Sequence, residues 1–427
     1  MGLALKRSRS GDGVSETEAD ESLEELGVLA ESAGAEVLHK TLQSRDTPEA
    51  ATLIGSGKVT ELSEQAKAFR ADLVLFDRDL TPTQLRNLEQ ALPCKVLDRT
   101  QLILDIFARR ARTREGQLQV ELAQLNYLLP RLTGRGVEMS RLGGGIGTRG
   151  PGETQLETDR RRIARRIGKI GHQLEAVRRH RSVQRRKRGA VPLATVALAG
   201  YTNAGKSTLF NALTGADVLA DAKMFATLDP TVRQLRLPSR RKVLLSDTVG
   251  FIRNLPPTLV KAFRATLEEV SEAALVLHLV DCSSPRAVEQ TAHVRQVLTE
   301  IGAAERPQVL VLTKLDLAPP NIEAEVLGRR ILKEAEAEPK PLPVAAVSAR
   351  TGAGISNLLH LIDELIPIDP IHHVYLRIPT RDASKLALIH EYGRVLWEHW
   401  DESGCDLEAD VPESIRGRLR AFLVNSR

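Results

Sequence analysis

The 427-residue chain has few cysteines and few aromatic residues, and each shortage excludes a class of protein. Its three cysteines, Cys94, Cys282 and Cys405, are far apart and show neither metal-type nor redox-type spacing, which argues against a disulfide framework and suits a reducing cytosol. Aromatic residues make up only 3% of the chain, so stacking on single-stranded nucleic acid is disfavoured.

The sequence also lacks membrane and export signals. Its longest apolar run, ALVLHLV, ends at Val280 and falls well short of the roughly 18 residues that indicate a membrane span. The first residues, MGLALKRSRSGDG, contain no apolar core of signal-peptide length, and Lys6 stands where a myristoylation motif needs Ser or Thr. We therefore expect a cytoplasmic protein without integral membrane association.

Five segments follow from composition and periodicity. Residues 1–20 are small, polar and acidic without periodicity, and we expect a disordered tail. In residues 21–112, helical stretches alternate with short apolar runs, which predicts a small α/β domain with a parallel sheet. Residues 190–366 hold five apolar runs separated by helical stretches, as a doubly wound parallel sheet requires. Residues 367–427 read as a small C-terminal α/β domain, with a strand at 374–378 and an amphipathic helix over 384–400.

Residues 113–189 predict a basic helical hairpin around a Gly-rich loop at 141–153. Apolar stripes run along both helices, at Leu118, Leu122, Leu125 and Leu129 and at Ile163, Ile167, Ile170, Leu174 and Val177. The second helix carries the basic residues Arg160, Arg161, Arg162, Arg165, Arg166, Lys169, Arg178, Arg179, Arg181, Arg185, Arg186, Lys187 and Arg188. Such density can neutralise many RNA phosphates. A solvated or internally paired helix remains the alternative.

The segment GYTNAGKS, Gly200–Ser207, fits G-x-x-x-x-G-K-[ST] between an apolar strand and a helix. Gly200 and Gly205 let backbone N–H groups point at phosphates, Lys206 reaches the terminal phosphates, and Ser207 offers a hydroxyl to Mg²⁺. This context predicts a phosphate-binding P-loop.

Two further elements predict a magnesium site and a switch. Asp247 of the segment DTVG ends a strand that we expect beside the P-loop strand, where its carboxylate can hold Mg²⁺ through water. Gly250 can give its backbone N–H to a γ-phosphate. Thr227 of MFATLDPT is the candidate second hydroxyl ligand of the metal, with a Thr in an ordinary turn before Pro230 as the alternative.

The base is selected by TKLD at 313–316, because the Asp316 carboxylate can accept from both N1–H and N2–H₂ of guanine, and adenine has no such donor pair. SAR at 348–350 can give a backbone N–H to guanine O6. The predicted nucleotide contacts are Gly200, Tyr201, Thr202, Asn203, Ala204, Gly205, Lys206, Ser207, Thr208, Phe225, Ala226, Thr227, Leu228, Asp229, Asp247, Thr248, Val249, Gly250, Thr313, Lys314, Leu315, Asp316, Ser348, Ala349 and Arg350. Lys206, Thr227 and Gly250 are the predicted catalytic residues, and Ser207, Thr227 and Asp247 the metal ligands.

Four segments that extend beyond what nucleotide binding demands resemble the HflX family of translational GTPases: residues 54–62, 106–132, 143–161 and 247–256. The resemblance implies a G domain at 190–366 that binds GTP or GDP with Mg²⁺ and acts on the large ribosomal subunit. It also implies dissociation of stalled or idle ribosomes under stress, with GTP hydrolysis stimulated by the ribosome. We expect a monomer that contacts ribosomal RNA through the hairpin.

The chain departs from the commonest pattern at two base-site positions, Thr313 in place of Asn and Arg350 in place of a frequent Lys. Phe251 stands where Ras-like enzymes place a water-orienting glutamine, so intrinsic hydrolysis should be slow. Two alternatives stay open at this point. One is an RNA-binding assembly or remodelling factor that uses nucleotide only as a sensor, and the other is an ATP-driven enzyme, although IGSGKVTE lacks the P-loop spacing.

Overall fold

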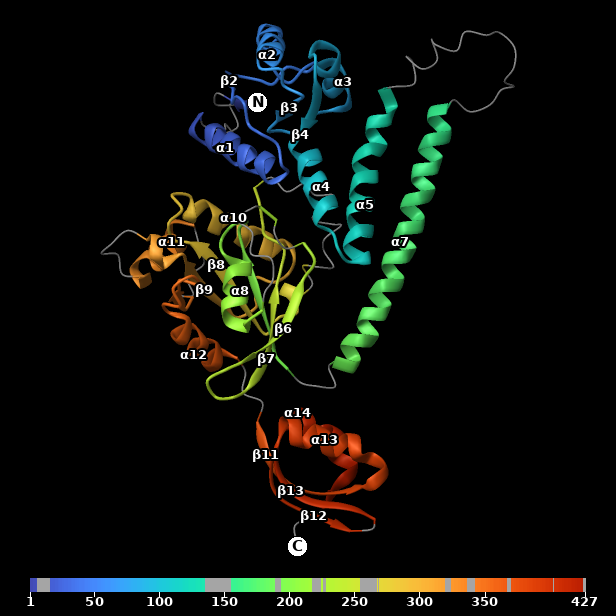
Figure 1. Ribbon diagram of the computed structural model, residues 1–427, viewed down its shortest axis with the longest axis vertical. Helices are drawn as coiled ribbons and strands as arrows, with labels where there is room; N and C mark the ends of the chain where they lie inside the picture. Colours follow the sequence, from blue (N-terminus) through green and yellow to red (C-terminus); the bar gives the residue numbers. More distant parts are fainter. Residues whose placement is uncertain are drawn as a thin grey trace.

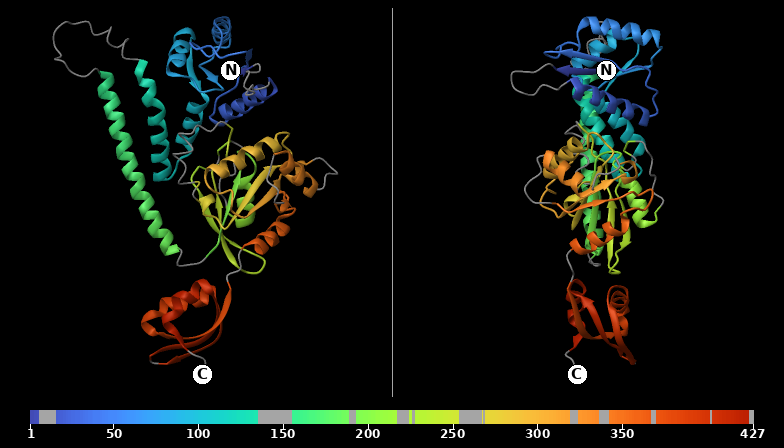
Figure 2. Two further views of the ribbon diagram at one scale, coloured as in Figure 1. Left: turned by 180° about the vertical axis from the view of Figure 1, so that it is seen from behind. Right: turned by 90° about the vertical axis from the view of Figure 1, so that its left-hand side faces the viewer.

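The computed structural model describes residues 1–5, 16–134, 155–188, 193–216, 224–225, 228–253, 267, 269–318, 324–335, 342–366, 370–401 and 403–424. An N-terminal α/β region lies at one end, the G domain in the middle and a small antiparallel domain at the other end (Figure 1). Two long helices run side by side along the N-terminal region and the G domain, as the views in Figure 2 also show.

The N-terminal region alternates strands and helices. Its elements are β1 (Gly2–Leu5), α1 (Glu16–Ser32), β2 (Leu42–Arg45), α2 (Ser56–Ala68), β3 (Leu73–Phe76), α3 (Pro82–Ala91), β4 (Lys95–Asp98) and α4 (Arg99–Arg110). β1 pairs in parallel with β2, and β3 with β4. Met1 links the two pairs, because its ammonium donates to the Leu75 carbonyl at 2.7 Å and its carbonyl accepts from Asp77 N–H at 3.0 Å. The strands pair in parallel as predicted, but as two two-stranded sheets rather than one.

The predicted disordered tail at 1–20 is wrong where the structure describes it. Gly2–Leu5 form β1, and α1 already begins at Glu16. Leu3 and Ala4 are buried in the sheet. A strand of four residues is too short to be predicted from periodicity. Residues 6–15 lie outside the described residues.

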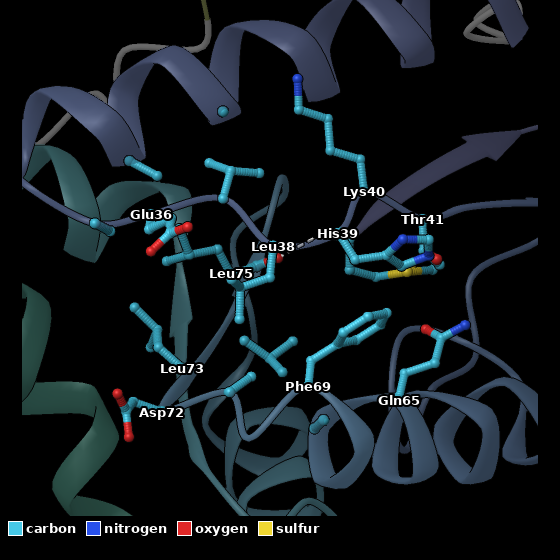
Figure 3. Close-up of a pocket in the computed structure, with 18 of the residues that line it drawn as sticks. Glu36, Leu38, His39, Lys40, Thr41, Gln65, Phe69, Asp72, Leu73 and Leu75 are labelled. Atoms are coloured by element: carbon cyan, nitrogen blue, oxygen red, sulfur yellow. Dashed lines mark hydrogen bonds between the residues drawn. The ribbon is translucent and has the colours of Figure 1, made fainter.

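A cavity of about 610 Å³ opens in this region beside Met1. Figure 3 shows His39 and Phe69 on one side of it and Leu73 and Leu75 on another. The His39 and Phe69 rings stack with centroids 5.6 Å apart. Its lining lies wholly within residues 1–75, so the cavity is separate from the strand ends that carry the nucleotide motifs.

The hairpin consists of α5 (Arg114–Leu128), the 3₁₀ turn η1 (Leu129–Gly134) and α7 (Gln155–Arg188). Leu118, Leu122 and Leu125 of α5 pack against Ile170 and Leu174 of α7, which confirms that the two apolar stripes face one another. Arg166 of α7 also donates to both carboxylate oxygens of Glu121, at 2.6 and 2.8 Å. The Gly-rich loop at 141–153 lies outside the described residues.

The G domain is a six-stranded sheet in the order β10-β9-β8-β5-β7-β6. Its elements are β5 (Thr195–Gly200), α8 (Lys206–Thr214), β6 (Thr231–Arg236), β7 (Lys242–Asp247), β8 (Leu275–Asp281), α10 (Ala287–Glu300), β9 (Gln308–Thr313), η2 (Leu315–Leu317), α11 (Ala324–Glu334), β10 (Val344–Ala346) and α12 (Ile355–Leu365). The α/β fold class is confirmed. β6, which the sequence prediction missed, runs antiparallel to β7 at the sheet edge. Among its residues TVRQLR, Leu235 alone is buried. The segment therefore has no apolar run from which the strand could be predicted.

One hydrophobic core joins the N-terminal region to the G domain. It contains Leu26 of α1, Phe107 of α4 and Val120 of α5 together with the strand residues of β5 and β8. Phe225 of the G domain meets Phe107 edge to face, with ring centroids 4.6 Å apart. Shape changes in the G domain can therefore reach the N-terminal helices through packed side chains.

The C-terminal domain has β11 (Ile371–Pro379), η3 (Thr380–Asp382), α13 (Ala383–Tyr392), β12 (Arg394–Asp401), β13 (Gly404–Pro412), α14 (Glu413–Leu419), η4 (Arg420–Phe422) and β14 (Leu423–Val424). Its antiparallel sheet has the order β12-β13-β11-β14. The predicted helix over 384–400 is wrong in its second half. The helix ends at Gly393, whose backbone is extended, and a Cβ there would lie 3.0 Å from the backbone oxygens of Asp410 and Ile389. The aromatic run VLWEHW then pairs with β13, in keeping with its strand preference.

In the parts of the chain that the structure describes, no helix combines the length and the apolar character needed to cross a membrane.

Candidate functional site

The P-loop joins the end of β5 to the start of α8. A Cβ on Gly200 would lie 2.6 Å from the Leu279 carbonyl oxygen of the neighbouring strand, so only glycine lets β5 and β8 approach this closely. Asn203 and Gly205 have positive φ values of 62° and 85°, which turn the chain into the first residue of α8, Lys206. The loop therefore brings backbone N–H groups to the amino end of a helix, the arrangement that binds phosphate.

Lys206 is buried in this loop. Its Nζ donates to the carbonyl oxygens of Gly200 at 3.1 Å and Tyr201 at 2.7 Å. Burial lowers the pKa of Lys206 to about 8, although the charge of Asp247 opposes that change. A phosphate beside Nζ would restore the charged form, because an opposite charge favours the ammonium.

Ser207 and Asp247 meet next to Lys206, as predicted for a metal site. The Ser207 hydroxyl donates to Asp247 Oδ2 at 2.8 Å, and Asp247 is fully buried at the carboxyl end of β7. A hydroxyl and a carboxylate are the hard oxygen donors that Mg²⁺ prefers, so the two residues fit a magnesium ion. The third predicted ligand, Thr227, lies outside the described residues, as does its neighbour Ala226.

The DTVG segment lies directly on the P-loop. Phe251 donates its N–H to the Gly200 carbonyl at 3.1 Å, and its own carbonyl accepts from Thr202 N–H at 2.7 Å. A Cβ on Gly250 would lie 2.9 Å from Lys206 Nζ and 3.1 Å from Thr202 Cα. The Phe251 side chain is buried and offers no polar group. The segment thus places Gly250 next to Lys206, and its Phe251 side chain cannot orient water.

The base motif occupies the ends of β9 and β10. The Ser348 hydroxyl donates to Asp316 Oδ1 at 2.7 Å, and this hydrogen bond lowers the pKa of the Asp316 carboxyl. The Thr313 hydroxyl lies 2.8 Å from the Ala204 carbonyl of the P-loop and 3.1 Å from the Val280 carbonyl. Its single proton serves one of those oxygens at a time. The structure therefore brings the base motif and the P-loop into direct contact.

Two details of this end were not foreseen. Lys314 has a positive φ of 57° and forms an ion pair with Asp281 at 2.7 Å, so Asp281 joins the candidate site. Asp281 ends an apolar strand as Asp247 does, and that position was the available signal. The Ser348 N–H already bonds to the Ala353 carbonyl at 2.9 Å, which leaves Ala349 and Arg350 as the candidate donors to guanine O6.

The described residues around Thr227 contact the N-terminal region and α5. Phe225 packs on Phe107, and Met224 N–H donates to the Ser32 hydroxyl at 3.0 Å. The Asp229 carboxylate accepts from the N–H groups of Arg112 at 2.9 Å and Thr113 at 2.8 Å. The nucleotide contact predicted for Asp229 would require it to leave these donors. The contact predicted for Phe225 would fall to its backbone, because its ring is buried.

The Tyr201 side chain also points away from the nucleotide motifs, toward α1. Its hydroxyl donates to the buried carboxylate of Glu25 in α1 and accepts from Arg253 N–H at 2.8 Å. Glu25 pairs in turn with Arg99 at 2.5 Å, and Arg99 with Asp77 at 2.8 Å. Sequence reasoning missed this buried network, since residues so far apart in the chain give no periodic signal.

Family models match three consecutive stretches of the chain, which together run from residue 20 to residue 314 with short gaps. Residues 20–108 match the GTP-binding GTPase N-terminal model, residues 110–188 the GTP-binding GTPase middle region, and residues 195–314 the model described as 50S ribosome-binding GTPase.

Relatives extend this similarity over most of the chain. The GTPase HflX of Caldanaerobacter subterraneus subsp. tengcongensis is 47% identical over 413 residues, covering 96% of this chain and 92% of that protein. The GTPase HflX of Escherichia coli K12 is 45% identical over 384 residues, covering 90% and 88%. A crystal structure of a GTP-binding protein from the hyperthermophilic archaeon Sulfolobus solfataricus in complex with GDP is 25% identical, with a TM-score of 0.44 and coverage of 85% and 98%.

Proposed function

The chain belongs to the HflX family of GTPases and hydrolyses GTP, and we propose that it works as a magnesium-dependent switch on the large ribosomal subunit. One geometric observation carries the proposal. The Ser207–Asp247 pair and the Asp316–Ser348 pair both follow the carboxyl ends of strands of one sheet, and the Thr313 contact joins the base motif to the P-loop. This arrangement suits a nucleotide whose phosphates meet the first pair and whose base meets the second.

In the proposed complex, Asp316 accepts from guanine N1–H and N2–H₂, and the hydrogen bond from Ser348 fixes the carboxylate in its acceptor-only form. Ala349 or Arg350 gives a backbone N–H to O6. Lys206 turns from the loop carbonyls to the terminal phosphates, and the Gly250 N–H meets the γ-phosphate. These contacts would distinguish GTP from ATP at the base and from GDP at the γ-phosphate.

Ser207 and Asp247 would hold the magnesium ion, with Thr227 as the third protein ligand. When bound, the ion supplies positive charge that neutralises the charge developing on the β- and γ-phosphate oxygens. Asp247 is buried, so its carboxylate is held on β7 without freedom to rotate away.

Hydrolysis needs a group that orients water, and the described part of the segment after Asp247 offers no such side chain. Phe251 is buried at the position of the water-orienting side chain. We infer that intrinsic turnover is slow and that the ribosome completes the site, as the match to a 50S ribosome-binding GTPase model supports.

The hairpin supplies the proposed RNA contact. Arg160, Arg162 and Arg165 are exposed on α7, where phosphates can reach them. Arg162 faces Asp159 at 3.5 Å, an exposed pair that a phosphate could replace at little cost. Binding through such residues should weaken steeply as salt rises.

The biological role that follows is the dissociation of stalled or idle ribosomes in the cytoplasm under stress, performed by a monomer in its GTP form. Hydrolysis to GDP then releases the protein. Ordering of the segment around Thr227 and Gly250 by the γ-phosphate would set the timing of release.

The test is sedimentation of the full chain with purified large subunits under GTP, GDP and a non-hydrolysable GTP analogue. We expect binding with the analogue, release with GDP, and faster phosphate release from GTP when subunits are present. Lys206→Ala should lose ribosome splitting while Lys333→Ala, an exposed residue on α11, keeps it. Full splitting by Lys206→Ala would leave the nucleotide as a sensor only, and unchanged turnover with subunits would refute the ribosomal role.

A further inference from the structure

The Asp229 carboxylate joins the G domain to the residues at the start of the hairpin. Asp229 lies two residues beyond Thr227, and its Oδ2 accepts the N–H groups of Arg112 at 2.9 Å and Thr113 at 2.8 Å. Its Oδ1 accepts the Thr113 hydroxyl. Three hydrogen bonds from the residues just before α5 therefore converge on a residue of the G domain.

Thr113 and Asp229 together cap α5. Thr113 is the N-cap residue, and its hydroxyl oxygen accepts from Gly116 N–H at 3.0 Å while its proton goes to Asp229. The carboxylate also sits over the amino end of the helix, where the helix dipole favours negative charge. Asp229 thus supplies negative charge and hydrogen-bond acceptors that a helix usually receives from the residues next to it in sequence.

Gly116 allows this approach. A Cβ built on Gly116 would lie 2.4 Å from Asp229 Oδ1, a separation that no real contact tolerates. The glycine has an αR position in the first turn of α5, where alanine would suit a helix better by about 1 kcal/mol. Its presence is explained by the carboxylate above it and not by the helix.

Movement of α5 would carry the hairpin. Leu118 and Leu122 of α5 pack against Ile170 of α7, and Arg166 holds Glu121 through both carboxylate oxygens. The two helices are therefore joined by packing and by an ion pair, and they move together more readily than apart.

We propose that Asp229 is a positioning residue that couples the nucleotide state of the G domain to the basic hairpin. This inference rests on the proposed switch, in which the γ-phosphate draws Thr227 to the metal. Two residues span at most about 7 Å, so a displacement of Thr227 of a few ångströms is felt at Asp229. Phe225, buried against Phe107, restrains the segment on the other side of Thr227. GTP and GDP would thereby set different contacts between Asp229 and α5, and so different hairpin positions.

Hydrogen exchange of the full chain tests the coupling without ribosomes. In the wild-type protein, the amides of residues 112–118 should exchange at rates that differ at least about fivefold between the GDP form and the form with a non-hydrolysable GTP analogue, the lower end of typical allosteric coupling. Gly116→Ala should abolish that difference by displacing Asp229. It should retain GDP binding, because the substitution changes no residue of the P-loop, the DTVG segment or the TKLD motif. Asp229→Ala should abolish the difference as well.

Gly168→Ala is the matched control, because it adds the same methyl group to α7, where a Cβ would meet nothing within 4 Å. It should keep the nucleotide dependence. Equal exchange in the two nucleotide forms of the wild-type chain would overturn the coupling, and so would a full difference in Gly116→Ala. If Asp229→Ala lost GDP binding while Gly116→Ala behaved like the wild-type chain, Asp229 would be a nucleotide contact and not a positioning residue. Failure of ribosome binding would refute the proposed function and leave these results unaffected.

Discussion

The hydroxyl of Tyr201, a P-loop residue, donates a hydrogen bond to the Glu25 carboxylate of α1, and both side chains are buried. The same hydroxyl oxygen accepts from Arg253 N–H, two residues beyond Phe251. Burial raises the pKa of Tyr201 and the charge of Glu25 adds to this effect, so the phenol stays a neutral donor. The P-loop, the DTVG segment and the N-terminal region therefore share one polar junction.

A double-mutant cycle with Glu25→Gln and Tyr201→Phe should give a coupling energy of about 1.5–3 kcal/mol, the range for a hydrogen bond to a charged group. Native-state hydrogen exchange in α1 and α8 is the measurement. Tryptophan fluorescence would miss the effect because both tryptophans, Trp397 and Trp400, lie in β12 of the C-terminal domain. A coupling near zero would mean that the bond is not made in solution.

The predictability of this site differs between its parts for a physical reason. The P-loop and the strand ends at Asp247 and Thr313 could be found because a phosphate site needs particular residues at fixed spacing after a strand. Asp229 and Tyr201 could be placed near those motifs but not assigned their contacts. Their partners, Thr113 and Glu25, come from distant parts of the chain.

The same distinction applies to the fold. Parallel strands with buried faces were visible as apolar runs, whereas β6 was missed because an edge strand buries little. The helix expected over 384–400 failed at Gly393, where a glycine ends the helix and the backbone also approaches that of β13 closely. Residue contacts distant in sequence decide both cases.

Thr313→Asn should tighten GDP binding severalfold. The threonine hydroxyl has one proton for two carbonyls, at Ala204 and Val280, and the asparagine amide has two. One added hydrogen bond is worth about 0.5–1.5 kcal/mol, or roughly 2- to 12-fold in affinity. Titration with fluorescent GDP measures it, and Thr313→Val should weaken binding by a similar factor. Weaker binding by Thr313→Asn would show that the pocket is too narrow for the amide.

Gly250→Ala should abolish the response to the γ-phosphate. The new methyl group would lie 3.1 Å from Thr202 Cα. Because this is a backbone atom, a side-chain rotation cannot relieve the contact. We expect GTP hydrolysis to fall about 100-fold or more, as when one hydrogen-bond donor to a transition state is lost. GDP affinity should stay within a few-fold of wild type. Rapid-quench hydrolysis assays with a GDP titration decide this, and equal losses for GDP and GTP would point to general disruption of the P-loop.

Asp316→Asn should change which base is bound. The amide offers one acceptor and one donor pair in place of two acceptors, so guanine loses a partner while xanthine, with a carbonyl at position 2, gains one. GDP affinity should fall at least about 100-fold, and xanthosine diphosphate should bind more tightly than GDP. Competition titrations measure both. Retained preference for GDP would mean that Asp316 does not contact the base.

The lowered pKa of Lys206 predicts that nucleotide binding takes up protons. Its folded pKa of about 8 lies below the unfolded value of 10.5, so the buried ammonium costs stability at low pH. That cost is relieved as the pH rises from about 8 to 10.5, where the unfolded chain binds more protons than the folded one.

Phosphate beside Nζ should return the pKa to a high value, so GDP binding at pH 8 should take up about half a proton. Calorimetry in two buffers of different ionisation enthalpy measures this uptake, which should vanish near pH 6.5, where Lys206 is already protonated. Buffer-independent heats at pH 8 would show that the free P-loop keeps Lys206 fully charged, and the carbonyls of Gly200 and Tyr201 would then be sufficient to hold its proton.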